Sequence, residues 1–219
     1  MCSRPYLISE TELVLIKTFD VKKKIAAVSI VGLLVLLTAC TPIISAATVG
    51  SKSISISDVQ TTVTEIMAER AKVTTNGMNL ETGEALNRSQ VTFFVISSIL
   101  DAIGTKNKIV VTDAEVATEI RNVTAQVGGA ANLPSAMVNA QIAPKNLQKY
   151  FHTYLLSSKI SKFLAASGIA AADVTAAEQK LVSDEAAKLN VTINPRYGYW
   201  DSARATIVAA PLAAGSVTK

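Results

Sequence analysis

Cysteine and histidine are scarce in this chain of 219 residues, which contains only Cys2, Cys40 and His152. Two cysteines so far apart favour neither a disulfide framework nor a thiolate site. A single histidine provides no ligand spacing for a metal ion, so we expect no metal and no cofactor. Nucleophilic catalysis would need a placed base, and His152 lies in an apolar-aromatic segment that is typical of a structural histidine. We therefore expect no enzymatic activity.

Aromatic and charged residues are also sparse, at 5% and 17% of the chain. The first 39 residues hold five of the 21 basic residues and three of the 17 acidic ones, within a total net charge of +4. From Cys40 on, 16 basic and 14 acidic residues leave a net charge of +2. Nucleic-acid-binding proteins usually show a clustered basic face, so we expect no nucleic-acid partner.

Residues 22–40 combine a basic start, an apolar run and a small-residue ending. Three lysines precede an unbroken apolar run from Ile25 to Leu37, and Thr38-Ala39-Cys40 follows. This order resembles a bacterial lipoprotein signal peptide at 21–39, with Cys40 as the lipid attachment site. The run to residue 39 is about 15 residues long, shorter than the roughly 20 that span a bilayer as a helix. Its length favours a removable signal over the alternative, an uncleaved anchor helix.

Residues 1–20 do not fit such a signal, because they place Glu10, Glu12 and Asp20 ahead of the lysines. Valine codons can start translation in bacteria, so we predict that translation begins at Val21 and that 1–20 is a mis-annotated leader. Lipidation of Cys40 would hold the mature chain on the extracytoplasmic face of the bacterial cell membrane. Its 180 residues are enough for one domain with a real core.

Apolar periodicity and capping patterns predict helices along most of the mature chain. These helices cover approximately residues 57–73, 88–106, 113–127, 134–141, 145–166 and 175–189. The capping pairs are Ser55 with Asp58, Thr112 with Glu115, and Thr175 with Glu178. The helix at 88–106 is apolar on so broad a face that we expect it to be central and covered on more than one side.

The remaining segments predict strands, a loop and flexible ends. A linker at 40–45 precedes a short strand at 46–49, and alternating apolar residues predict a second strand at 191–194. Two X-Gly turns and little apolar content predict a flexible loop at 74–87. The Ala-, Gly- and Ser-rich residues 209–219 predict a flexible tail.

Three short motifs resemble the N-terminal region of SurA/PrsA-type extracytoplasmic chaperones. They are Ala47-Thr48-Val49-Gly50 with Ile54-Ser55 and Asp58-Val59, then Val111–Val116, then Asn194–Asp201. The resemblance implies a SurA-N-like helical domain at 46–208 whose helices form an open, curved surface for unfolded segments. It also implies that strand 46–49 pairs with 191–194. The few residues between Gly168 and Val174 leave no room for the family's parvulin domain, so we expect no prolyl-isomerase activity.

The expected fold is mainly α, an open bundle of about five to six helices with a small two-stranded sheet joining the N- and C-terminal ends. The expected function is that of a membrane-anchored, chaperone-like lipoprotein that binds unfolded exported polypeptides without ATP. An alternative is an accessory envelope lipoprotein that binds one specific folded partner. The absence of a reactive constellation fits both.

Aromatic residues are the candidates for contact with an unfolded client. They are Tyr150, Phe151, Tyr154, Tyr197 and Trp200. Apolar residues at helical spacing more often form core than a binding groove, and this holds for the three on the helix at 145–166. Tyr197 and Trp200 form either a binding ledge or a packed cover beside the terminal strands.

Overall fold

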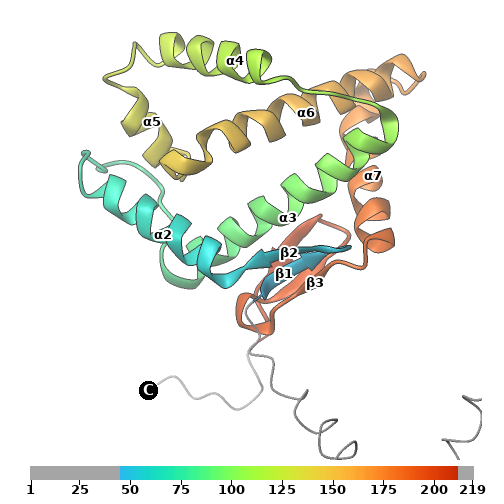
Figure 1. The fold of residues 1–219 in the computed structure, drawn as a ribbon, viewed down its shortest axis with the longest axis horizontal. Coiled ribbons are helices and arrows are strands. Elements are labelled where there is room, and N and C mark those ends of the chain that lie inside the picture. Colours follow the sequence, from blue (N-terminus) through green and yellow to red (C-terminus); the bar gives the residue numbers. More distant parts are fainter. Residues whose placement is uncertain (1–44, 212–219) are drawn as a thin grey trace, which may run out of the picture. The chain divides into compact units, whose positions relative to one another are not determined.

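Six α-helices and five short strands make up the part of the chain that the computed structural model describes, residues 45–211 (Figure 1). The fold is therefore mainly α, as predicted. The expected leader at 1–20, signal peptide at 21–39, lipidated Cys40 and most of the tail lie outside the described residues.

Strands from both ends of the domain meet in one antiparallel sheet. They are β1 (Ser45–Val49), β2 (Lys52–Ser55) and β3 (Thr192–Ile193), in the order β2-β1-β3. Ala47 pairs with Ile193 and Thr48 with Thr192, which confirms the predicted pairing of the two ends. The sheet has three strands instead of two, because Gly50 adopts a φ of +59° and turns the chain back so that β2 pairs with β1.

A second antiparallel sheet, which the sequence did not predict, follows β3. It consists of β4 (Tyr199–Asp201) and β5 (Thr206–Val208). Gly198 permits the entry into β4, since its φ is +114° and a Cβ there would lie 2.0 Å from the carbonyl oxygen of Val208. The strand pair brings the buried Ile207 to the main core.

Each of the six predicted helices is present. They are α2 (Ile56–Arg70), α3 (Gly83–Asn107), α4 (Asp113–Gln126), α5 (Leu133–Asn139), α6 (Leu147–Ala166) and α7 (Val174–Lys188). Helix α3 begins at Gly83, inside the predicted loop 74–87. Leu86 is buried in a small apolar cluster with Ile66 and Ala143, and this tertiary contact favours helix where the local sequence favours a loop.

Two of the three predicted helix caps are confirmed. The Ser55 hydroxyl accepts a hydrogen bond from the Asp58 amide at 2.9 Å. Thr112 and Glu115 form the reciprocal capping box of α4.

The predicted cap of α7 is wrong. Asp173 occupies the N-cap position and Thr175 lies inside the helix. Glu178 instead accepts hydrogen bonds from Ser157, at 2.5 Å, and from Ser161, both on α6. Its carboxylate thus connects two helices and does not cap its own, because two hydroxyls on the facing helix provide stronger partners than a backbone amide.

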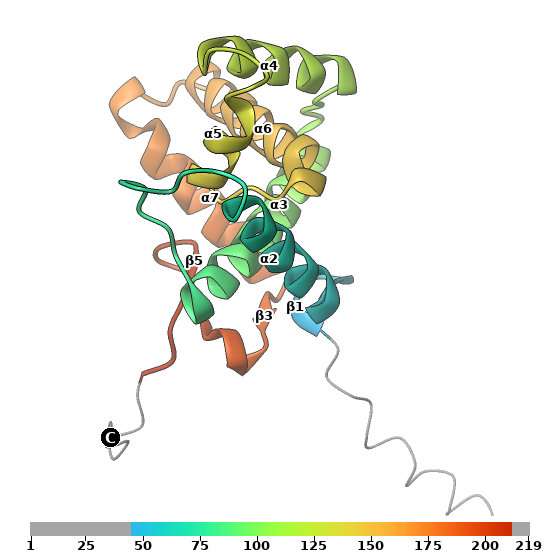
Figure 2. The same cartoon turned by 90° about the vertical axis from the view of Figure 1, so that its left-hand side faces the viewer.

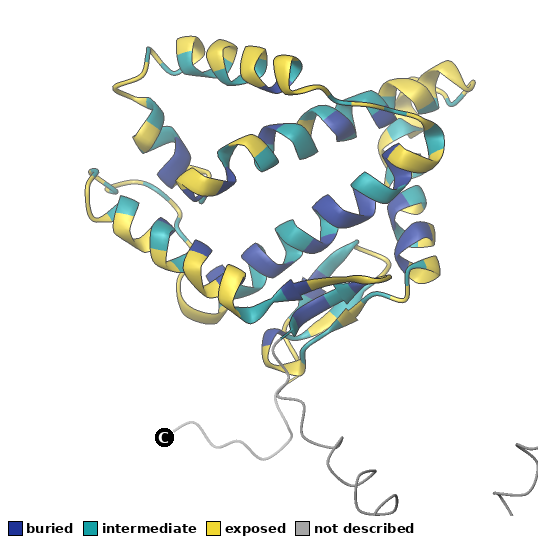
Figure 3. Cartoon of the chain, in the orientation of Figure 1, coloured by how far each residue is buried: buried dark blue, intermediate teal, exposed yellow. Residues whose placement is uncertain are grey.

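Helix α3 is central, as predicted. It contacts α2, α6, α7, β1 and β5, and its inner face buries Val91, Val95, Ile99 and Ile103. Figure 3 shows this face in dark blue, whereas α4 is largely yellow. In both Figure 1 and Figure 2, α4 lies at the opposite end of the domain from the β1–β3 sheet, with α6 beneath it.

Candidate functional site

The five aromatic candidates divide between core and surface. Phe151 and Tyr197 are buried, with 6% and 4% of their surface exposed, so they are corrected from client-binding candidates to core residues. Trp200 is half-buried and packs against the main core. Tyr150 is half-buried and Tyr154 is 53% exposed. Tyr150 and Tyr154, one turn apart on α6, therefore remain the accessible candidates.

A row of four aromatic rings connects α3 to α6. The centroids of Phe94 and Phe93 lie 5.4 Å apart, those of Phe93 and Tyr150 6.3 Å, and those of Tyr150 and Phe151 5.5 Å. These separations fall in the range at which aromatic pairs attract. Sequence reasoning missed Phe93 as a site residue. Its position two residues after Val91 and two before Val95, outside the spacing of the buried face, was the available signal.

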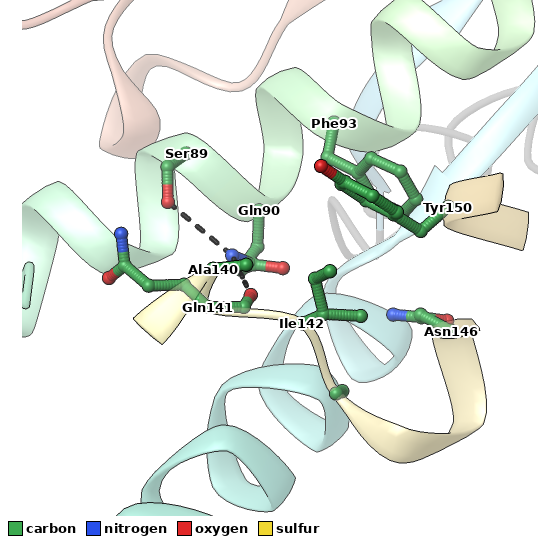
Figure 4. A pocket seen from close by; sticks show the side chains of 9 residues that line it. Ser89, Gln90, Phe93, Ala140, Gln141, Ile142, Asn146 and Tyr150 are labelled. Atoms are coloured by element: carbon green, nitrogen blue, oxygen red, sulfur yellow. Dashed lines mark hydrogen bonds between the residues drawn. The ribbon is translucent and has the colours of Figure 1, made fainter. Parts of the chain in front are cut away.

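Phe93 and Tyr150 form one wall of a pocket of about 160 Å³ (Figure 4). The pocket lies between the N-terminal half of α3 and the segment that joins α5 to α6. Its lining consists of Ser89, Gln90, Phe93, Ala140, Gln141, Ile142, Ala143, Asn146 and Tyr150. In Figure 4 the Ile142 side chain points toward the Phe93 and Tyr150 rings. Aromatic and aliphatic groups with a few fixed amides are typical of a site for an apolar side chain.

Hydrogen bonds to Gln141 hold the floor of this pocket. Gln141 adopts a φ of +57°, its carbonyl accepts from Gln90 Nε2 at 3.3 Å, and its Oε1 accepts from Arg70 Nη2 at 2.8 Å. The Glu81 amide donates to the same Oε1 at 3.0 Å. Burial lowers the pKa of Arg70, against the opposing charge of Glu81. Since α2, α3 and the loop between them all bond to Gln141, the pocket is held from three sides.

The aromatic residues near the C-terminus pack beside the terminal strands. The Tyr197 carbonyl accepts from Arg88 Nε at 3.2 Å, and the Arg196 guanidinium lies 5.3 Å from the Tyr197 ring centroid. Tyr199, on β4, is 51% exposed. The packed-cover interpretation of Tyr197 and Trp200 is therefore the one that fits their burial.

Polar bonds attach the start of α4 to α6. Lys159 Nζ donates to both carboxylate oxygens of Glu115, at 2.7 and 2.8 Å, and to the Val110 carbonyl at 2.6 Å. The Lys159 hydrogen bonds, followed by those from Thr112, lower the pKa of Glu115 to about 2. Val116 is the one fully buried residue of this helix.

His152 lies on α6 with its Nδ1 3.7 Å from Asp101 Oδ1. Across residues 45–211, no three His, Cys, Asp or Glu side chains come close enough together to hold a metal ion. None of the helices in the same range is long and apolar enough to cross a membrane.

No family model, curated protein or solved structure matches this chain. The resemblance to the SurA/PrsA-type domain therefore stays a prediction from short motifs.

Proposed function

We propose that this protein is a membrane-anchored, extracytoplasmic chaperone-like lipoprotein that binds unfolded exported polypeptides without ATP. The lipoprotein-type signal ending at Cys40 supports its location. The aromatic surface between α3 and α6 supports its activity, since apolar surface that remains accessible is what binding to an unfolded chain requires.

The observation that carries the proposal is the pocket wall of Phe93 and Tyr150, continued by the exposed Tyr154. A pocket of about 160 Å³ suits a single apolar side chain better than a whole small ligand, since small-molecule pockets usually start at about 300 Å³. Tyr154 would extend the contact along α6 to neighbouring residues of the same segment. Short, sequence-tolerant contacts of this kind fit a client that presents many different sequences.

The test is suppression of aggregation by the chain from residue 41 onward, after its cooperative melting has been established. Two unrelated, chemically unfolded proteins are diluted into it without nucleotide, and light scattering is followed. We expect suppression of both at near-stoichiometric ratios, and a several-fold loss in Tyr154→Ser. Tyr199→Ser is the matched control, because Tyr199 is equally exposed but lies on β4.

No suppression of either client by a folded chain would contradict the proposal. It would favour the alternative, an accessory envelope lipoprotein that holds one folded partner, which crosslinking in whole cells would then identify.

A further inference from the structure

Three surface hollows lie next to one another along α6 and the C-terminal half of α3. The first, of about 640 Å³, lies between α4 and α6, and the second, of about 500 Å³, shares His152 with it. The third, of about 420 Å³, shares Asp101 and Thr105 with the second. Because neighbouring hollows share lining residues, they form a continuous track, here called the α6 groove. It is separate from the pocket at Phe93 and Tyr150.

Basic side chains outnumber acidic ones in the α6 groove. The basic ones are Lys52, Lys106, Lys108, Arg121 and Lys149, and the acidic ones are Asp101 and Asp113. Lys106 has its own partner, Glu185, at 3.2 Å. Counting that carboxylate, the groove still has five cations against three anions. The excess contrasts with the nearly balanced mature chain.

Asp101 is shared by several basic groups at the centre of the groove. Its Oδ2 lies 3.7 Å from Lys52 Nζ and its Oδ1 lies 3.7 Å from His152 Nδ1. Lys149 is half-buried, and no carboxylate within residues 45–211 lies within 4.0 Å of its ammonium group. Burial, and then the charge of Lys52, lower the pKa of Lys149, while Asp101 acts in the opposite direction. A partly desolvated ammonium without an adjacent carboxylate is costly unless a ligand supplies one.

We propose that the α6 groove binds an acidic segment of an unfolded polypeptide, with a side-chain carboxylate of that segment on Lys149 and Arg121. The choice of an unfolded client as the source of the segment rests on the proposed function. Val116, Ala117 and Ile120 line the groove beside these cations. Apolar walls next to a cationic centre complement a segment that alternates acidic and apolar residues, and they offer little to a free phosphate.

The occupant has to come from another molecule. Residues 41–44 and 212–219 contain neither Asp nor Glu, and the acidic residues of 1–39 leave with the signal peptide if Cys40 is the first mature residue. The chain itself therefore has no acidic terminal segment to place in the groove.

The test measures peptide binding to the full chain in a nonionic detergent by fluorescence anisotropy. The probe is a peptide of alternating Asp and Leu labelled with a neutral dye, and its match has Asn at every Asp. We expect the Asp peptide to bind about tenfold more tightly than the Asn peptide, as one desolvated ion pair allows. Rising salt should reduce this difference.

Three lysine or arginine variants locate the site. Lys149→Met should remove most of the preference for Asp, and Arg121→Met should remove part of it. Lys162→Met is the matched control on the same helix, because Lys162 is exposed and lies outside the groove. If Lys149→Met fails to melt cooperatively, the exposed Arg121 decides the question, since its replacement leaves the core intact.

Equal affinity for the two peptides, or an undiminished preference in Lys149→Met and Arg121→Met, would overturn the proposal. Displacement of the peptide by inorganic phosphate, at concentrations where acetate has no effect, would reassign the groove to phosphate groups and overturn it as well. Loss of aggregation suppression with intact Asp-peptide binding would remove the chaperone role and leave the groove. The opposite result would remove only the groove.

Discussion

Helices α3 and α4 are held in place in different ways. Ten residues of α3 are buried, and they contact a sheet and several helices. Helix α4 buries Val116 alone and depends on its capping box and on the bonds between Glu115 and Lys159. Apolar burial is cooperative and extends through the domain, whereas a few exposed polar bonds act locally. The domain therefore combines a firm base of α3 and strands with an α4 end that can open at lower cost.

The same substitution in the two helices gives the largest expected contrast. Ile99 is fully buried in α3, and Ile99→Ala should lower the free energy of unfolding by about 4 kcal/mol through lost burial and a cavity. Ile120 is half-buried on α4 beside an open groove, so Ile120→Ala should cost only about 1 kcal/mol. Urea unfolding of both variants measures the difference. Equal costs would refute the distinction between a firm base and a loosely held α4.

Glycines at the two ends of the domain provide the second comparison. Gly198→Ala should cost about 3 kcal/mol, because its φ of +114° is strained for alanine and the new Cβ overlaps the backbone of β5. Gly129, just after α4, has a φ of +103° but no atom within 4 Å of such a Cβ, so Gly129→Ala should cost only about 1 kcal/mol of backbone strain. Thermal or urea melts of the two variants test this order. A Gly129 variant as unstable as the Gly198 variant would show that steric overlap with β5 is not the deciding term.

Acid titration should act on α4 first and gives the smallest effect. The pKa of Glu115 is lowered to about 2 from an ordinary value near 4.5. Its contribution is therefore complete above about pH 4.5 and is lost as the pH falls toward 2. Hydrogen exchange at α4 should accelerate over this range while α3 stays protected. Glu115→Gln should show the fast α4 exchange already at pH 7, and unchanged exchange in that variant would contradict the role given to Glu115.

Local patterns predicted the parts of the fold that local contacts determine. The Thr112–Glu115 box and the Ser55 cap involve residues three apart, so the sequence shows both partners together. The pairing of 46–49 with 191–194 was also predicted, although only through the family resemblance. The same local logic failed for Glu178, because its partners Ser157 and Ser161 lie on another helix.

The candidate site was harder to predict, because accessibility depends on tertiary packing. Spacing alone placed Phe151 beside Tyr150 and Tyr154, but only the position of α3 decides that Phe151 is buried and Tyr154 exposed. Phe93 lies 57 residues from Tyr150 along the chain, so no local pattern brings their rings together. The β4–β5 pair escaped prediction for a similar reason, since each strand has only three residues.

Photo-crosslinking from α6 tests the central claim most directly. A benzoylphenylalanine residue replaces Tyr154 in one variant and Tyr199 in another, and each is irradiated with an unfolded client. The account predicts efficient crosslinks from position 154 and few from position 199, although both side chains are about half exposed. Equal crosslinking from the two positions, or none from position 154, would contradict the assignment of client binding to the surface between α3 and α6.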